Sequence, residues 1–161
     1  MSVQRKHRIS KRRPATASGL VNFYIHGHAG AKELNGESFE RASIIAIIRR
    51  GLPVKELSLL QRSLDLPIEK LAPKLGISRA TLHRRKARGV LGPHESDRVV
   101  RFARLLGKAL EVFETEENAR RWLQSPQVGL GGAVPLDYAE TEVGAREVED
   151  LLDRIEYGVY S

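Results

Sequence analysis

Hydrophobic residues recur at helical spacing through most of the chain from Ser38 onward. The clearest pattern covers residues 97–114, where apolar side chains three or four positions apart alternate with basic ones, so a long amphipathic helix is predicted there. Shorter stripes predict further helices, and their apolar positions are Ile44, Ile45, Ile47, Ile48, Val54, Leu57, Leu60, Leu64, Val148, Leu151, Leu152, Ile155 and Val159. No segment shows the alternation that is typical of a strand. The predicted fold class is therefore all-α.

Several residues mark where these helices begin and end. Gly51 and Pro53 predict a stop followed by a restart. Thr115, followed by two glutamates, is typical of an N-cap with acids in the first helical turn. Pro135 suits the first turn of another helix. Two prolines and three glycines between residues 125 and 135 predict a loop.

The first 35 residues show no sustained hydrophobic period. They begin with a basic run and continue with proline, glycine and small polar residues, a composition that favours disorder. We therefore expect residues 1–35 to form a flexible basic arm, which either contacts phosphates or serves only as a solubilising tail. The basic run consists of Arg5, Lys6, Arg8, Lys11, Arg12 and Arg13.

Charge is distributed unevenly along the 161 residues, whose formal net charge is +7. Lys and Arg minus Asp and Glu give +6 for residues 1–13, +1 for 14–60, +8 for 61–110 and −8 for 111–161. A basic middle and an acidic end do not suit one polyanionic partner. Two different partners are therefore predicted.

Composition also excludes several classes of protein. The chain has no cysteine, so it has no disulfide framework, thiolate zinc site or cysteine nucleophile. No nucleophile elbow, phosphate loop or paired ligand spacing is present, so we predict no enzyme activity and no catalytic, cofactor-binding or metal-binding residue. The longest aliphatic run, residues 44–48, is far shorter than the roughly 20 residues of a membrane span. A cytoplasmic protein without a membrane partner is expected.

Residues 68–89 have the pattern of a helix-turn-helix motif. Leu71 and Leu75 are expected to face inward, Gly76 permits the positive φ of a tight turn, and Ser78 is placed to cap the second helix. Pro73 disagrees with the pattern, because it removes a backbone hydrogen bond from the first helix. That helix is therefore expected to be short or kinked.

The second helix of this motif carries the candidate DNA-binding side chains. If Leu82 anchors it to the core, a step of about 100° per residue places Arg84 on the opposite face, where a guanidinium pairs bidentately with guanine. Arg85 and Lys86 lie nearer the buried side, and we expect them to bond phosphates or an acid such as Glu69. The alternative is a helical hairpin with a solvated basic face. The predicted DNA-binding residues are Ser78, Arg79, Ala80, Thr81, His83, Arg84 and Arg88.

Further motifs lie on both sides of the helix-turn-helix. They are the Gly51-Leu-Pro segment, Glu95-Ser-Asp-Arg98, and the blocks Trp122…Pro126…Leu130-Gly-Gly…Pro135-Leu and Ile155-Glu-Tyr-Gly-Val. In this order, over residues 40–161, they resemble the antitoxins of the Xre/MbcA/ParS family, and the C-terminal third resembles the family's toxin-binding domain.

The resemblance implies an antitoxin of a type II toxin–antitoxin system. Its partner is then a RES-type toxin that consumes NAD or transfers ADP-ribose, and the C-terminal domain inhibits the toxin by covering its active site. The helix-turn-helix is expected to bind operator DNA and repress the operon. We therefore divide the chain into the arm at residues 1–35, a DNA-binding region at 36–96 and a helical toxin-binding domain at 97–161.

Exposed aromatic side chains near a terminus make good interface anchors, because tyrosine buries a large area at a low cost in entropy. The residues expected to reach the toxin are Arg154, Glu156, Tyr157, Gly158 and Tyr160. Tyr157 packing on its own lobe is the alternative. Trp122 is expected in the core, with a partner contact as its alternative. The acids of the last helix are expected to form either a solvated face or a surface that steers a basic toxin, and they are Glu147, Glu149, Asp150, Asp153 and Glu156.

A homodimer is expected, because one recognition helix reads few base pairs and half-sites about 34 Å apart suit two-fold symmetry. The alternative function is a dimeric helix-turn-helix transcription factor without a toxin partner, in which the acidic lobe is only a dimerisation module.

Overall fold

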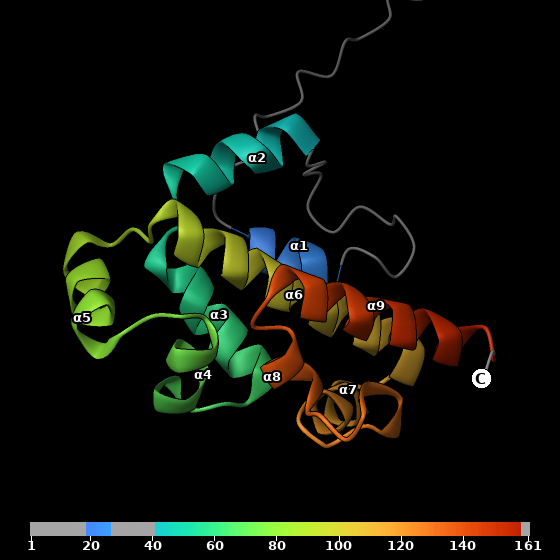
Figure 1. Ribbon diagram of the computed structural model, residues 1–161. Helices are drawn as coiled ribbons and strands as arrows, with labels where there is room; N and C mark the ends of the chain where they lie inside the picture. The colour runs from blue at the N-terminus through green and yellow to red at the C-terminus, as the bar shows by residue number, and fades with distance from the viewer. Residues whose placement is uncertain (1–18, 27–40, 159–161) are drawn as a thin grey trace, which may run out of the picture.

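The computed structural model describes residues 19–26 and 41–158. Its helices are α1 (Leu20–His26), α2 (Arg41–Arg50), α3 (Val54–Leu64), α4 (Ile68–Lys74), α5 (Arg79–Arg88), α6 (Pro93–Phe113), α7 (Glu116–Leu123), the 3-10 turn η1 (Val128–Leu130), α8 (Pro135–Tyr138) and α9 (Glu142–Glu156) (Figure 1). The described residues contain no strand, only an isolated bridge between Pro53 and Val90. The predicted all-α fold is confirmed.

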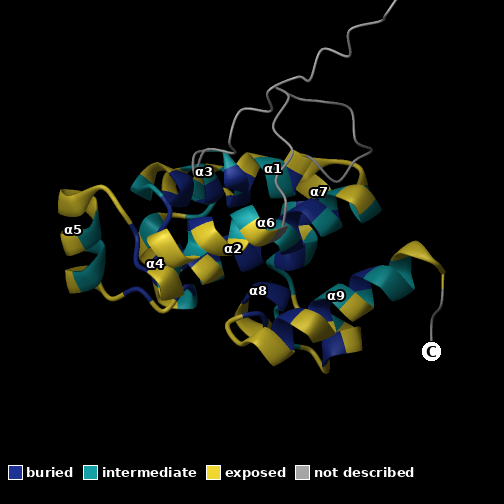
Figure 2. Ribbon diagram, turned by 90° about the horizontal axis from the view of Figure 1, so that it is seen from above, coloured by how far each residue is buried: buried dark blue, intermediate teal, exposed yellow. Residues whose placement is uncertain are grey.

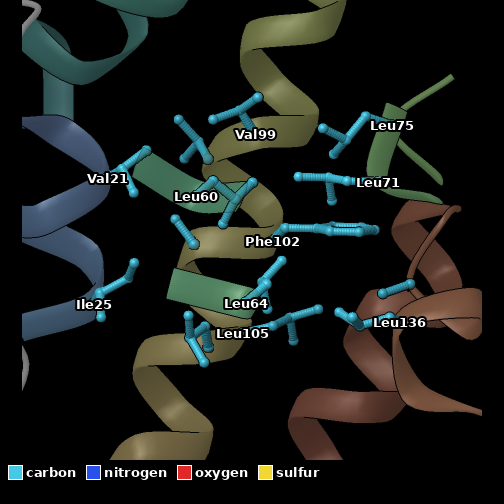
Figure 3. Close-up of a cluster of buried hydrophobic side chains, with 14 of the residues drawn as sticks. Val21, Ile25, Leu60, Leu64, Leu71, Leu75, Val99, Phe102, Leu105 and Leu136 are labelled. Atoms are coloured by element: carbon cyan, nitrogen blue, oxygen red, sulfur yellow. The ribbon is translucent and has the colours of Figure 1, made fainter. Parts of the chain in front are cut away.

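Helix α6 is the central element, and α1, α2, α3, α7 and α9 all pack against it (Figure 1). Ten of its 21 residues are buried. Phe102 lies near the middle of this set, and Figure 3 shows its ring reaching towards Leu71 of α4 and Leu136 of α8. The helix begins four residues before the predicted residue 97, because Pro93 is well suited to a first helical turn.

The signals that mark helix ends are confirmed. Helix α2 ends at Arg50, and α3 begins after Pro53. The Thr115 side chain caps α7 by accepting a hydrogen bond from the Asn118 backbone N–H at 3.2 Å. Pro135 occupies the first turn of α8. None of the helices within the described ranges is long and apolar enough to cross a membrane.

The DNA-binding and toxin-binding regions predicted from the sequence share one hydrophobic core. The boundary expected between residues 96 and 97 falls inside α6. Polar contacts also cross it: Lys74 of α4 forms an ion pair with Asp137 beside it on α8, and the Gln124 side chain donates to the Leu64 carbonyl at 2.8 Å. The two regions are therefore joined by packing over a broad area rather than by a linker.

Residues 20–26 fall within the expected disordered arm, but they form helix α1, so the expectation is wrong for this segment. Leu20, Val21 and Ile25 are buried. Seven residues are too few to show a hydrophobic period, and so short a helix depends on tertiary packing. Helix α1 approaches α6 closely at Gly107, because this residue has no side chain to collide with the Tyr24 carbonyl. The rest of the expected arm lies outside the described residues.

A buried carboxylate holds the start of α1. Glu56 of α3 is fully buried and accepts hydrogen bonds from the backbone N–H groups of Gly19 at 2.8 Å and Val21 at 2.9 Å. These N–H groups lie at the helix N-terminus, where they have no partner within the helix and where the helix dipole favours a negative charge. Glu56 thus takes the place of an N-cap residue for α1.

Replacing Glu56 by alanine tests this cap. The Glu56→Ala variant leaves two N–H groups without their acceptor, so the free energy of unfolding should fall by about 1–3 kcal/mol, as measured by urea denaturation. The control is Ser58→Ala at an exposed position of the same helix, where the change should stay within about 0.5 kcal/mol. Equal losses in both variants would contradict the role given to Glu56.

Candidate functional site

The helix-turn-helix lies in α4, α5 and the turn between them. Helix α4 is short and has Pro73 in its last turn, as predicted. Gly76 has a φ of +64°, and buried Ile77 fills the corner. The Ser78 side chain caps α5 by accepting a hydrogen bond from the Thr81 backbone N–H at 3.1 Å. The local expectations for the motif are confirmed.

Helix α5 presents its predicted contact residues to solvent. It has no fully buried residue, and it lies at one edge of the molecule in Figure 2. Leu82 is half-buried and packs against the core, as the predicted anchor. Thr81 is half-buried, and the remaining members of the predicted set, Ser78, Arg79, Ala80, His83, Arg84 and Arg88, are exposed. Their contact with DNA stays a prediction.

Arg85 bonds an acid, which was one of the two expectations for it, but the acid is Glu95 rather than Glu69. Its guanidinium forms an ion pair with Glu95, at 3.3 Å between Nη2 and Oε1, whereas Glu69 is exposed on α4. Glu95 stands in the first turn of α6, only ten residues after Arg85, and its carboxylate is within reach of the guanidinium. Arg85 therefore positions α5, and Lys86 beside it remains exposed.

The beginning of α6 holds the whole motif. Besides Glu95, the Ser96 hydroxyl accepts a hydrogen bond from the Leu52 backbone N–H at 2.8 Å. Arg98 donates to the Leu75 carbonyl at 3.1 Å and covers Gly76, where any side chain would meet its guanidinium. Glu95 and Arg98 thus act as positioning residues for α5 and its turn, and Ser96 holds the chain just before α3. In the sequence this segment contributed only to the family resemblance, and no structural role was predicted for its residues.

Two basic residues beside α5 were missed by the sequence reasoning. Gly51 packs against the Leu91 carbonyl, and the Val54 N–H donates to the Gly89 carbonyl at 3.0 Å. These backbone contacts bring the end of α2 and the start of α3 to the end of α5. Arg50 and Lys55, both exposed, adjoin these contacts in the chain and so lie near the end of α5. Nothing in the sequence indicated this placement, because residues 14–60 are nearly neutral overall and only tertiary contacts bring Arg50 and Lys55 near α5.

The acidic face of α9 is partly neutralised within the molecule. Basic side chains of α6 face it, so Glu149 and Asp153 are not free to attract a partner, contrary to one expectation for them. Glu147, Asp150 and Glu156 are exposed. The ion pairs are Arg101–Glu142 at 3.1 Å, Arg104–Glu149 at 2.6 Å and Lys108–Asp153 at 2.7 Å.

The predicted toxin-contacting residues lie at the end of α9. Tyr157 is 75% exposed, so the alternative in which it packs on its own lobe is wrong. Glu156 and Gly158 are exposed and Arg154 is half-buried, whereas Tyr160 lies outside the described residues. Trp122 instead packs on the core, with its ring centroid 5.5 Å from that of Phe113, in agreement with its expected structural role.

Two family models match the chain. Residues 43–104 match the antitoxin Xre-like helix-turn-helix domain. Residues 108–158 match the antitoxin Xre/MbcA/ParS C-terminal toxin-binding domain. Neither is an enzyme family. The two matches meet within α6, so each covers one of the two surfaces described above.

Individual antitoxins are also similar to this chain over most of their own length. An antitoxin Xre from Yersinia enterocolitica is 34% identical over 120 residues, which cover 73% of this chain and 81% of the relative. An antitoxin Xre from Photorhabdus laumondii is 32% identical over 118 residues, covering 72% and 80%. A protein named Prs ADP-ribosylating antitoxin, from a Sphingobium species, is 25% identical over 127 residues, covering 73% and 80%.

Removing Glu95 tests the positioning of α5. In Glu95→Ala the largely buried Arg85 loses its carboxylate, so the backbone amides of α5 should exchange hydrogen faster, with a loss of about 1–3 kcal/mol in local stability. The control is Glu117→Ala, which breaks the exposed pair with Arg121 within α7 and should change stability by less than about 1 kcal/mol. If the backbone amides of α5 exchange hydrogen at the wild-type rate in Glu95→Ala, the positioning role given to Glu95 is wrong.

Proposed function

Because the chain belongs to the Xre family of antitoxins from toxin–antitoxin systems, we propose that it inhibits a RES-type toxin and represses its own operon. The C-terminal helices cover the active site of a toxin that consumes NAD or transfers ADP-ribose. The helix-turn-helix binds operator DNA in the cytoplasm, as part of a homodimer whose two α5 helices enter half-sites about 34 Å apart.

The observation that supports this proposal is the separation of two surfaces of different character. Exposed, basic α5 lies at one end of the molecule, and the end of α9 with Tyr157 lies at the other, in both Figure 1 and Figure 2. A single partner would have to span the whole molecule to use both. The arrangement suits one polyanion and one protein bound at the same time.

The reaction class of the toxin is supported by a relative. One similar protein carries the name Prs ADP-ribosylating antitoxin. That name fits a partner toxin that transfers ADP-ribose from NAD. In this reading the antitoxin contributes no chemistry, and it acts by excluding substrate from the toxin.

For DNA binding, the exposed residues divide into two roles. Arg84 lies on the outward face of α5 and is proposed to read a guanine in the major groove. Arg50 and Lys55 lie beside the end of α5 and are proposed to contact phosphates, which set the register but carry no sequence information.

Two alanine variants separate base reading from phosphate contact. Arg84→Ala should weaken operator binding about 5- to 150-fold more than it weakens binding to random DNA, as measured by fluorescence anisotropy. Lys55→Ala should weaken both about equally and reduce the slope of log affinity against log salt by about 1. If Arg84→Ala weakens both DNAs equally, Arg84 contacts phosphate instead.

Toxin inhibition is tested by co-expression with the adjacent reading frame and by binding of the purified proteins. The wild-type chain should restore growth, and Tyr157→Ala should weaken toxin binding by about 30-fold or more, as expected for an exposed aromatic anchor. The control is Val90→Ala, at an exposed position in the DNA-binding half, which should bind normally. Unchanged toxicity in the presence of the wild-type chain would favour the transcription factor without a toxin partner.

A further inference from the structure

Most of the exposed large apolar side chains belong to the C-terminal part of the chain. Among the described residues, six large hydrophobic side chains are exposed, and four of them lie within residues 108–158. Tyr138 and Val143 lie close together, since both line one hollow of the surface, and exposed apolar groups that lie together typically mark an interaction site. The six are Ile45, Val90, Val128, Tyr138, Val143 and Tyr157.

Two of these residues lie at opposite ends of one face of α9. With a step of about 100° per residue, five side chains fall within about 40° of a single line along the helix, and the line is about 21 Å long. We call this set the outer stripe, and Figure 2 shows exposed residues along the length of α9. It consists of Val143, Glu147, Asp150, Arg154 and Tyr157.

The other faces of α9 are already occupied. Opposite the outer stripe, Ala145, Val148 and Leu152 are buried in the core. A further face carries the acids that pair with Arg101, Arg104 and Lys108 of α6. The outer stripe is thus the most exposed side of α9, and only Arg154 in it is half-buried.

A hollow adjoins the start of the outer stripe. It has a volume of about 340 Å³ and lies between α8 and the first turn of α9, where Tyr138, Val143 and Glu147 contribute to its lining. Helix α8 approaches closely because Gly144 has no side chain, and any side chain there would collide with the Tyr138 carbonyl. Its lining is partly apolar, from Tyr138 and Val143, and partly acidic, from Asp137 and Glu147.

We propose that the toxin docks along the outer stripe of α9 and places an apolar side chain in this hollow. The proposal rests on the proposed function and extends its contact surface by about 21 Å, from Tyr157 to Val143 and Tyr138. The matching toxin surface carries an apolar protrusion with basic side chains beside it, which face Glu147 and Asp150.

Interface size supports the extension. A stable protein–protein interface uses about 20–30 residues on each side. The five residues predicted at the end of the chain fall far short of that number. The outer stripe continues directly from Tyr157, and it lies within the segment that matches the toxin-binding domain. It therefore enlarges the predicted contact towards that size by adding Val143, Glu147 and Asp150.

Charge favours the toxin over a second copy of this chain. Glu147 and Asp150 are exposed, and no ion pair within the described residues neutralises them. Two copies packed stripe to stripe, in either direction, would bring the Asp150 carboxylates of both copies together, which costs binding energy. A toxin surface with basic side chains gains from the same carboxylates.

The test measures binding of the full-length chain to the purified toxin encoded by the adjacent reading frame, by calorimetry. Val143→Asp should weaken binding by about 30-fold or more, because a charge would replace an apolar contact. An acid in the first turn of α9 agrees with the helix dipole, so the fold should be retained. The control is Ile45→Asp, the same kind of change at an exposed position of α2, which should alter affinity less than about twofold.

A second variant tests the role of charge at Glu147, which is exposed. Glu147→Lys should slow association with the toxin, and the difference from wild type should shrink as salt is added. If the wild-type chain binds and both variants bind equally well, the docking surface is wrong and the proposed function stands. If the wild-type chain does not bind, both are wrong. If Val143→Asp abolishes self-association but not toxin binding, the outer stripe belongs to a second copy, and the proposal is overturned.

Discussion

The burial of α6 is the constraint on which the rest of the structure depends. A 21-residue helix with ten buried positions must be covered on several sides, and five other helices pack against it. Phe102 illustrates the result, because its ring reaches towards leucines from both the DNA-binding and the toxin-binding region. The two regions therefore share one core, and neither can shift without disturbing the other.

Polar side chains of α6 then set the orientation of its neighbours. At its beginning, Glu95 and Arg98 hold α5 and the preceding turn. Further along, Arg104 and Lys108 pair with acids of α9. Much of the positive charge in the middle of the chain thus serves internal contacts. The basic residues left for DNA are those on α5 and at its edges, a smaller set than the net charge of the segment suggests.

This division of charge bears on both proposed functions. The proposed DNA-binding surface is built on one exposed helix, α5, which agrees with a helix that enters a groove and with a dimer that doubles the number of contacts. The proposed toxin-docking surface is longer, because one face of α9 pairs with α6 while Val143 and Tyr157, at the two ends of the outer stripe, stay exposed. An inhibitor that covers an active site needs such an extended contact area.

Local features of this protein were determined by the sequence alone. The helical periods, the Thr115 and Ser78 caps and the turn at Gly76 depend on residues within about one turn of each other, where propensity and hydrogen bonding act without the rest of the fold. Tertiary structure decided what depends on distant residues. Glu56 supplies a cap 35 residues away from Val21, and Arg85 bonds Glu95 rather than Glu69. Which acids of α9 stay exposed was decided in the same way, because a side chain's partner follows from how helices pack and not from its place in the chain.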